Sequence, residues 1–77
     1  MSSNEIQTER SMIIFVNGQE TQISNGHTAH DLLLDLGFET RPVAVEVNKE
    51  VIPRALLPSR VLCEHDQIEV VTLVGGG

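Results

Sequence analysis

The segment from Thr28 to Gly37 is the best-defined element of the sequence. Its apolar residues recur at i, i+3, i+4 and i+7, which places them on one face of a helix: Ala29, Leu32, Leu33 and Leu36. Thr28, with Asp31 three residues later, has the pattern of an N-terminal capping box, and Gly37 suits the residue that ends a helix. A chain of 77 residues forms one domain at most, so one main helix must cover whatever sheet it contains.

Strand-like runs lie on both sides of this helix. Asn17-Gly18 separates two of them, and this dipeptide between apolar runs is the strongest short-range signal for a hairpin. Asn48-Lys49 makes a second turn, and His65-Asp66 a third before the last strand. The predicted strands cover residues 12–16, 19–23, 43–47, 51–52 and 68–73. Pro53 and Pro58 bracket a stretch that we expect to form a helical turn within a loop.

The order of these elements predicts an α+β fold. One amphipathic helix packed on one face of a mixed sheet of four to five strands buries this set of residues. The first and last strands are both strongly apolar, so we place them side by side at the centre, which is the β-grasp (ubiquitin-like) topology. We expect a flexible tail over residues 1–11, the β-grasp domain over 12–74 and a flexible glycine tail over 75–77.

The face of the sheet away from the helix has a composition that solvent-exposed strands do not usually have. Alternation along the first and last strands puts four apolar residues there: Ile13, Phe15, Val71 and Leu73. A contiguous exposed apolar patch usually marks a binding site for a partner protein. The alternative is that the loop around Ala55–Leu57 folds over part of this face.

The charge and composition exclude several classes of partner. With 11 acidic and 5 basic residues the net charge is −6, which opposes binding to nucleic acid and to anionic membranes. No apolar run has the length of a membrane span, and the first residues lack a basic segment followed by an apolar one, so we expect no secretory signal. Cys63 is the single cysteine, which fits a cytoplasmic location. We expect the free protein to be a monomer.

No set of side chains has the pattern of a catalytic or metal centre. Cys63 and His65 lie two residues apart, and His27 and His30 three apart, whereas a metal site needs three or four ligands. Cys63 is expected to be a half-buried apolar residue. We therefore predict no bound metal or cofactor, and no enzymatic activity for the isolated chain.

The carboxyl end of the sequence is its most unusual part, because Gly75, Gly76 and Gly77 directly follow the last strand. A terminal carboxylate is a poor electrophile until it is activated, for instance as an acyl adenylate. Glycine suits passage through a narrow enzyme channel because it has no Cβ and adopts either sign of φ. The alternative is a frayed end or a cloning remnant.

Taken together, these segments resemble the ThiS family of sulfur carrier proteins of thiamine biosynthesis. The resemblance covers residues 12–77 and rests on five stretches: Ile14-Phe-Val-Asn-Gly18, the helix from Thr28 to Leu36, the segment from Val45 to Pro53, Asp66-Gln-Ile-Glu-Val-Val and the glycine end. One departure is that the family ends in two glycines and this sequence in three.

The resemblance implies a mechanism and a set of partners. An E1-like adenylyltransferase would use ATP to adenylate the carboxylate of Gly77, and Gly75 and Gly76 would thread the tail into that enzyme. A cysteine desulfurase or another donor would supply sulfur to form a thiocarboxylate. Thiazole synthase would accept this sulfur, with the chain as its co-substrate.

Three other functions remain open at this point. The small subunit of molybdopterin synthase shares the fold and the glycine end. A ubiquitin-like modifier would be attached to lysines through Gly77. An inert β-grasp binding module would keep its function without the final glycines.

Overall fold

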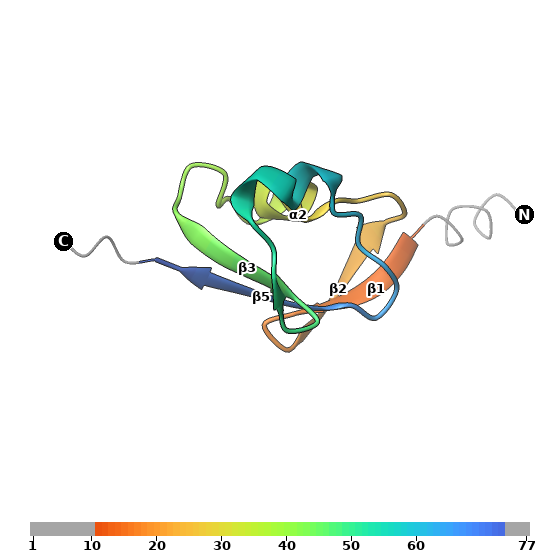
Figure 1. Ribbon diagram of the computed structural model, residues 1–77. Helices are drawn as coiled ribbons and strands as arrows, with labels where there is room; N and C mark the ends of the chain where they lie inside the picture. The colour runs from red at the N-terminus through yellow and green to blue at the C-terminus, as the bar shows by residue number, and fades with distance from the viewer. Residues whose placement is uncertain (1–10, 74–77) are drawn as a thin grey trace, which may run out of the picture.

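A computed structural model describes residues 11–73 and contains a five-stranded sheet with helices on one side (Figure 1). Its elements are β1 Ser11–Val16, β2 Gln19–Ser24, α2 Ala29–Leu36, β3 Val43–Val47, β4 Glu50–Val51, the 3-10 helix η1 Arg54–Ser59 and β5 Gln67–Thr72. The strand order is β2-β1-β5-β3-β4. The predicted α+β, β-grasp arrangement is confirmed, with the first and last strands adjacent.

The sheet is mixed. β1 and β5 run parallel, with Phe15 opposite Gln67 and Val16 opposite Ile68, and the other neighbouring strands are antiparallel. β5 therefore occupies the middle of the sheet, between β1 on one side and β3 on the other. The strand that leads toward the glycine end is thus also the strand around which the sheet is built.

Both ends of α2 follow the predicted signals. The Asp31 N–H donates to Thr28 Oγ1 (3.1 Å), and the Thr28 N–H donates to Asp31 Oδ2 (3.0 Å), which completes the capping box. Gly37 has φ of 82°, a left-handed conformation that favours glycine. Leu36, the last residue of the apolar helix face, is 40% exposed, because the helix ends there and Phe38 packs against the core instead.

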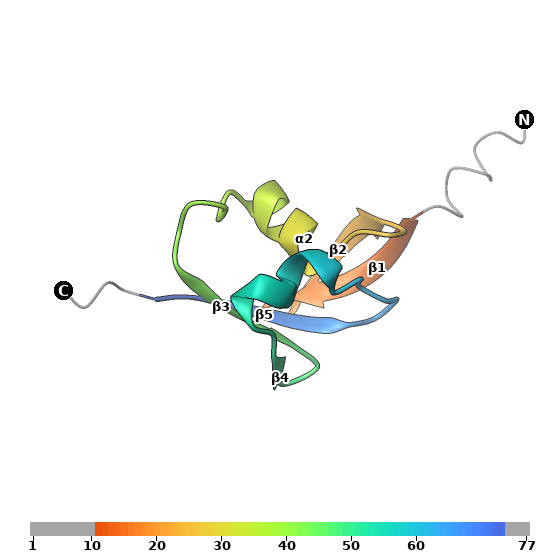
Figure 2. The same ribbon diagram turned by 45° about the horizontal axis from the view of Figure 1, so that its top comes forward.

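The core lies between the sheet and the helices and is aliphatic. Figures 1 and 2 show α2 and η1 on the same side of the sheet. The predicted helical turn is present as η1, and its Leu57 is buried in this core. The loop around Ala55–Leu57 therefore packs on the helix side and does not fold over the opposite face of the sheet.

The predicted boundaries differ from the structure by one residue at the amino end. β1 begins at Ser11, which pairs with Ser24, so the strand starts one residue before Met12. The rest of the predicted amino-terminal tail, Val74 and the glycine tail 75–77 lie outside the described residues. Within residues 11–73, no helix has the length and apolarity that crossing a membrane requires.

Candidate functional site

The candidate site is the part of the sheet from which the chain continues to Gly75, Gly76 and Gly77. Those three glycines lie outside the described residues, so the structure defines the strand that delivers them and its surroundings. β5 has Ile68 and Val70 buried and Glu69 and Val71 exposed, as alternation predicts. The face of the sheet opposite α2 and η1 (Figure 1), which no element within residues 11–73 covers and which we call the outer face, carries these exposed side chains.

The four predicted patch residues fall into two pairs on the outer face. Val71 and Leu73 are 54% and 50% exposed, whereas Ile13 and Phe15 are partly buried. Phe15 lies opposite Gln67, and Val71 lies four residues further along β5, about 13 Å away. The expectation of one contiguous patch is therefore wrong, because β1 ends opposite Ile68, before the part of β5 that carries Val71.

The loop before β5 covers part of the first pair. The His65 ring stacks on Phe15, with ring centroids 6.4 Å apart and an interplanar angle of 29°. The Ile13 N–H donates to Glu64 Oε2 (2.9 Å), and the His65 N–H donates to the Ile13 carbonyl (2.7 Å). Ile13 and Phe15 thus help to anchor this loop, which explains why they are less exposed than Val71 and Leu73.

Two carboxylates lie side by side on the outer face, between the apolar pairs. Glu46 of β3 is directly opposite Glu69 of β5, and their neighbours Val45, Val47, Ile68 and Val70 point into the core. Like charges directly opposite each other on neighbouring strands destabilise a sheet. Beside Val71 and Leu73, this pair makes the outer face both acidic and apolar.

The side chain of Asn17 holds the middle of β5. Asn17 is the first residue of the β1–β2 turn and has φ of 51°. The Val70 N–H donates to Asn17 Oδ1 (2.9 Å), and Asn17 Nδ2 donates to the Val70 carbonyl (3.3 Å). The amide of this side chain therefore pairs with β5 beyond the last residue of β1.

Asn48, the corresponding residue of the β3–β4 turn, holds the beginning of β5. The Gln67 N–H donates to Asn48 Oδ1 (3.0 Å), and Asn48 Nδ2 donates to Asp66 Oδ1 (3.0 Å). Asp66 is buried, and its Oδ2 accepts from the Cys63 N–H (2.8 Å). Both turns were predicted from the sequence, but the contacts of their asparagines with β5 were missed, because they depend on which strands become neighbours.

Cys63 itself is exposed, so the expectation that it is half-buried is wrong. The buried residue in this loop is its neighbour Leu62, at 2% exposure. Among residues 11–73, no three His, Cys, Asp or Glu side chains are grouped closely enough to hold a metal ion.

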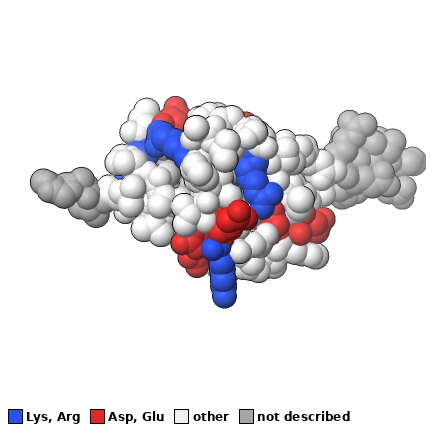
Figure 3. Space-filling view, in the orientation of Figure 1, with Lys and Arg blue, Asp and Glu red and all other residues white. Residues whose placement is uncertain are grey.

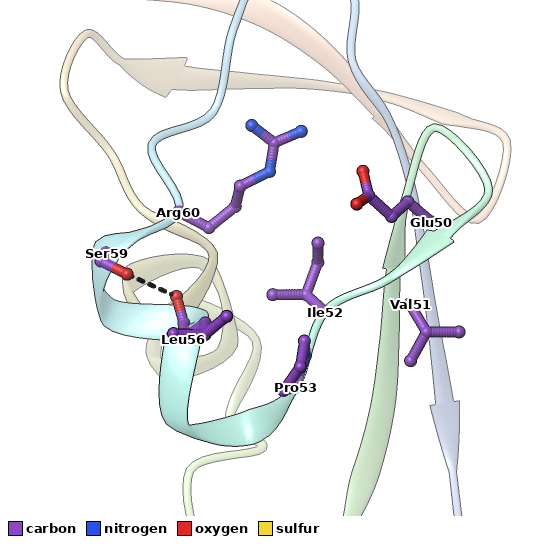
Figure 4. A pocket seen from close by; sticks show the side chains of 7 residues that line it. All are labelled: Glu50, Val51, Ile52, Pro53, Leu56, Ser59 and Arg60. Carbon is purple, nitrogen blue, oxygen red and sulfur yellow. Dashed lines mark hydrogen bonds between the residues drawn. The ribbon is translucent and has the colours of Figure 1, made fainter.

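A hollow of about 360 Å³ lies between η1 and β4 (Figure 4). Glu50 and Arg60 stand on opposite sides of it, and Ile52, Pro53 and Leu56 form its apolar lining. The titratable groups that line it are one carboxylate and one guanidinium, and this pair does not have the composition of a nucleophile with its base. Figure 3 shows Lys and Arg in separate groups on one face of the molecule.

The comparisons with known proteins agree with this arrangement. The sequence profile of the ThiS family matches residues 6–77. The chain belongs to the ThiS family. The sulfur carrier protein ThiS of Escherichia coli is 30% identical over 66 residues, which are 86% of this chain and all of that protein. The family predicted from the sequence is thereby confirmed.

A solved structure and a longer relative complete the comparison. The crystal structure of thiamine biosynthesis protein ThiS from Geobacter metallireducens superposes with a TM-score of 0.71 at 28% identity, covering 86% of this chain and all of that one. A thiazole synthase from Magnetococcus marinus is 47% identical over 66 residues. The ThiS-family chain covers only 20% of the length of that synthase.

Proposed function

We propose that this ThiS-family chain is a sulfur carrier of thiamine biosynthesis that holds sulfur as a thiocarboxylate on Gly77. The observation that carries the proposal is the family match over residues 6–77, which includes the three glycines. The similarity to a sulfur carrier protein ThiS over the whole length of that protein supports the carrier role. As a carrier, the chain is the substrate of other enzymes rather than a catalyst.

The chemistry begins with activation of the terminal carboxylate. An oxygen of the Gly77 carboxylate attacks the α-phosphorus of ATP on an E1-like adenylyltransferase, and pyrophosphate leaves. The product is an acyl adenylate, in which AMP is a good leaving group. Without this step the carboxylate stays anionic at neutral pH and resists nucleophiles.

Sulfur then replaces AMP at the activated carbonyl. The terminal sulfur of a persulfide on a cysteine desulfurase attacks the Gly77 carbonyl carbon, and AMP leaves with the bonding electron pair. A thiol reduces the resulting acyl disulfide, which releases the thiocarboxylate and forms a disulfide between the two thiol sulfurs. Hydrosulfide can take the same role directly, because its attack yields the thiocarboxylate without a reduction.

The glycines suit this sequence of reactions. A side chain at residues 75–77 would widen the tail and restrict φ, whereas glycine lets the tail enter a narrow channel in any of several conformations. Ordering the tail costs about 1–2 kcal/mol per residue, so docking of the folded domain must offset that cost. Val71 and Leu73, next to the Glu46–Glu69 pair, are the exposed residues best placed for this docking.

We propose that thiazole synthase is the enzyme that accepts the sulfur from this carrier. The similarity of this chain to one fifth of a protein named thiazole synthase supports a thiazole synthase as the partner of this domain. The same similarity favours the thiamine branch over the molybdopterin branch and over lysine modification. The proposal places these reactions in the cytoplasm, where ATP and cysteine are available.

Intact-mass measurement tests the proposal. The chain is incubated with the E1-like adenylyltransferase of the same organism, ATP and sulfide, and the expected product is heavier by the exchange of one oxygen for sulfur. A chain lacking Gly76 and Gly77 is the matched control, because its tail is shorter by about 7 Å and should not reach the nucleotide. Absence of the mass change in the full chain contradicts the proposal.

A further inference from the structure

The second half of β5 has an open hydrogen-bonding edge. The carbonyl of Ile68 accepts from the Asn17 N–H (2.8 Å), and both backbone groups of Val70 bind the Asn17 side chain. Even-numbered residues of β5 therefore direct their N–H and C=O toward β1. Leu73 does the opposite, because its N–H donates to the Pro42 carbonyl on the β3 side (2.9 Å).

Thr72 is the next even-numbered residue, and alternation directs its N–H and C=O to the same side. There β1 has already ended: Val16 lies opposite Ile68, and the chain then turns through Asn17 and Gly18 into β2. Thr72 lies about 7 Å beyond Val70, the last residue that Asn17 reaches. Within residues 11–73, no strand occupies the position next to Thr72 on this side.

We propose that an extended backbone segment of the enzyme that activates the tail pairs with Thr72 as an added strand of this sheet. Two observations favour a strand as the occupant. The N–H and C=O of Thr72 form the hydrogen-bonding pattern of a strand edge, and the chain runs directly from this edge to the glycines that the enzyme must bind. Addition of a strand to an open edge is a common mode of protein recognition.

The added strand has a definite geometric role. It lies in line with β1, beyond the Asn17-Gly18 turn, and so completes the sheet where β1 ends. Pairing there fixes the direction in which β5 leaves the domain, and it limits the entropy that the tail loses on entering the active site. The exposed Val71 and Leu73 side chains lie on the outer face beside the same edge and can pack on the partner's surface.

Replacement of one backbone amide by an ester tests this proposal, which rests on the proposed function. Cys63 is exposed and allows residues 63–77 to be joined to residues 1–62 by native chemical ligation. An ester between Val71 and Thr72 removes the Thr72 N–H and weakens the Val71 carbonyl, which faces β3, only as an acceptor. The matched control is the same ligated protein with an all-amide backbone. A second ester, between Val70 and Val71, removes an N–H that faces β3.

The readout is the KM for the carrier in ATP–pyrophosphate exchange by the adenylyltransferase. The Thr72 ester should raise KM by about five- to tenfold with little change in kcat or Tm, because one hydrogen bond to the partner is lost. The second ester, which removes the Val71 N–H, should instead lower Tm, because that N–H faces β3 within the sheet. An unchanged KM for the Thr72 ester overturns the edge proposal, whereas an all-amide chain that is not adenylated overturns the proposed function itself.

Amide hydrogen exchange gives a second, independent test without any chemical change. In the free chain the Thr72 N–H should exchange faster than the Val70 N–H, which is bonded to Asn17. Addition of the adenylyltransferase should slow exchange at Thr72. If the enzyme does not slow exchange at Thr72, the proposal is contradicted. If exchange at Thr72 slows in the free chain as the chain concentration rises, the proposal is also contradicted, because another copy of the chain then pairs with this edge.

Discussion

The two halves of β5 differ in how the rest of the protein holds them. From Gln67 to Val70 the strand has neighbours on both sides, through β1 and Asn17 on one side and β3 and Asn48 on the other. From Val71 to Thr72 its only strand neighbour among residues 11–73 is β3, and its Val71 side chain on the outer face is exposed. We therefore expect the first half to contribute more to stability, and we propose that the second half binds a partner.

This difference suits the proposed function, in which the carboxylate of Gly77 is the group that is activated. A strand bonded on both sides resists local opening, whereas an edge held on one side opens at a lower free energy. The transition occurs within one residue, between Val70 and Val71. Substitutions before this boundary should therefore lower the free energy of unfolding, whereas substitutions after it should mainly affect binding to a partner.

The largest effect on stability is expected for Ile68→Ala. Ile68 is 1% exposed in the centre of the core, and loss of such a side chain costs about 2–5 kcal/mol in the free energy of unfolding. Val71→Ala, at the exposed half, should cost less than about 0.5 kcal/mol. Urea denaturation of both variants checks the comparison, and equal losses in the two variants would show that the halves are held alike.

A smaller effect is expected for Asn17→Gly. Glycine keeps the left-handed conformation of the turn but lacks the amide that bonds Val70. We expect a loss of about 1–2 kcal/mol in the free energy of unfolding, together with faster exchange of the Val70 amide. If the Val70 amide exchanged as slowly in the variant as in the wild-type chain, the Asn17 side chain would not be what holds β5 at Val70.

The smallest effect on stability is expected for Asp31→Asn, in the cap of α2 and away from the boundary in β5. The hydrogen bond from the Thr28 backbone N–H, aided by the Thr28 side chain, lowers the pKa of Asp31 below its ordinary value of 3.8. A lowered pKa in the folded state contributes stability above the unfolded value, and this contribution is lost as the pH falls through the folded value. Asp31→Asn removes this contribution.

Measurement of unfolding free energy between about pH 6 and pH 2 tests this expectation. The wild-type chain should lose more stability than Asp31→Asn as the pH falls below about 4, and the sulfur loading of the two proteins at neutral pH should agree. A variant that keeps the full acid dependence would show that other carboxylates cause it. If the variant lost sulfur loading, the cap of α2 would affect the function of the second half of β5 as well as the stability of the domain.

Much of the fold was predictable because its signals are local. The capping box at Thr28 and Asp31, the left-handed residue at Gly37 and the turn at Asn17-Gly18 each depend on residues close in sequence. The adjacency of the first and last strands followed from their apolar composition. The exposure of Leu36 was not predictable, because the helical pattern does not show how far the core extends along the helix.

The site was less predictable because it depends on register. Alternation alone put Ile13, Phe15, Val71 and Leu73 on one face, but the sequence does not tell where β1 ends relative to β5. That offset of about four residues separates the two pairs, and it also leaves the edge at Thr72 open. The asparagine contacts with Val70 and Gln67 depend on the same offset.

Reconstituted thiazole formation tests most directly whether sulfur is held on the last carbonyl while the folded domain only docks. The full chain and a chain lacking Gly76 and Gly77 are each supplied, with adenylyltransferase, ATP and sulfide, to thiazole synthase and its other substrates. The account predicts thiazole phosphate with the full chain and none with the shortened chain, although both have the same Tm. Equal product from the two chains would contradict it.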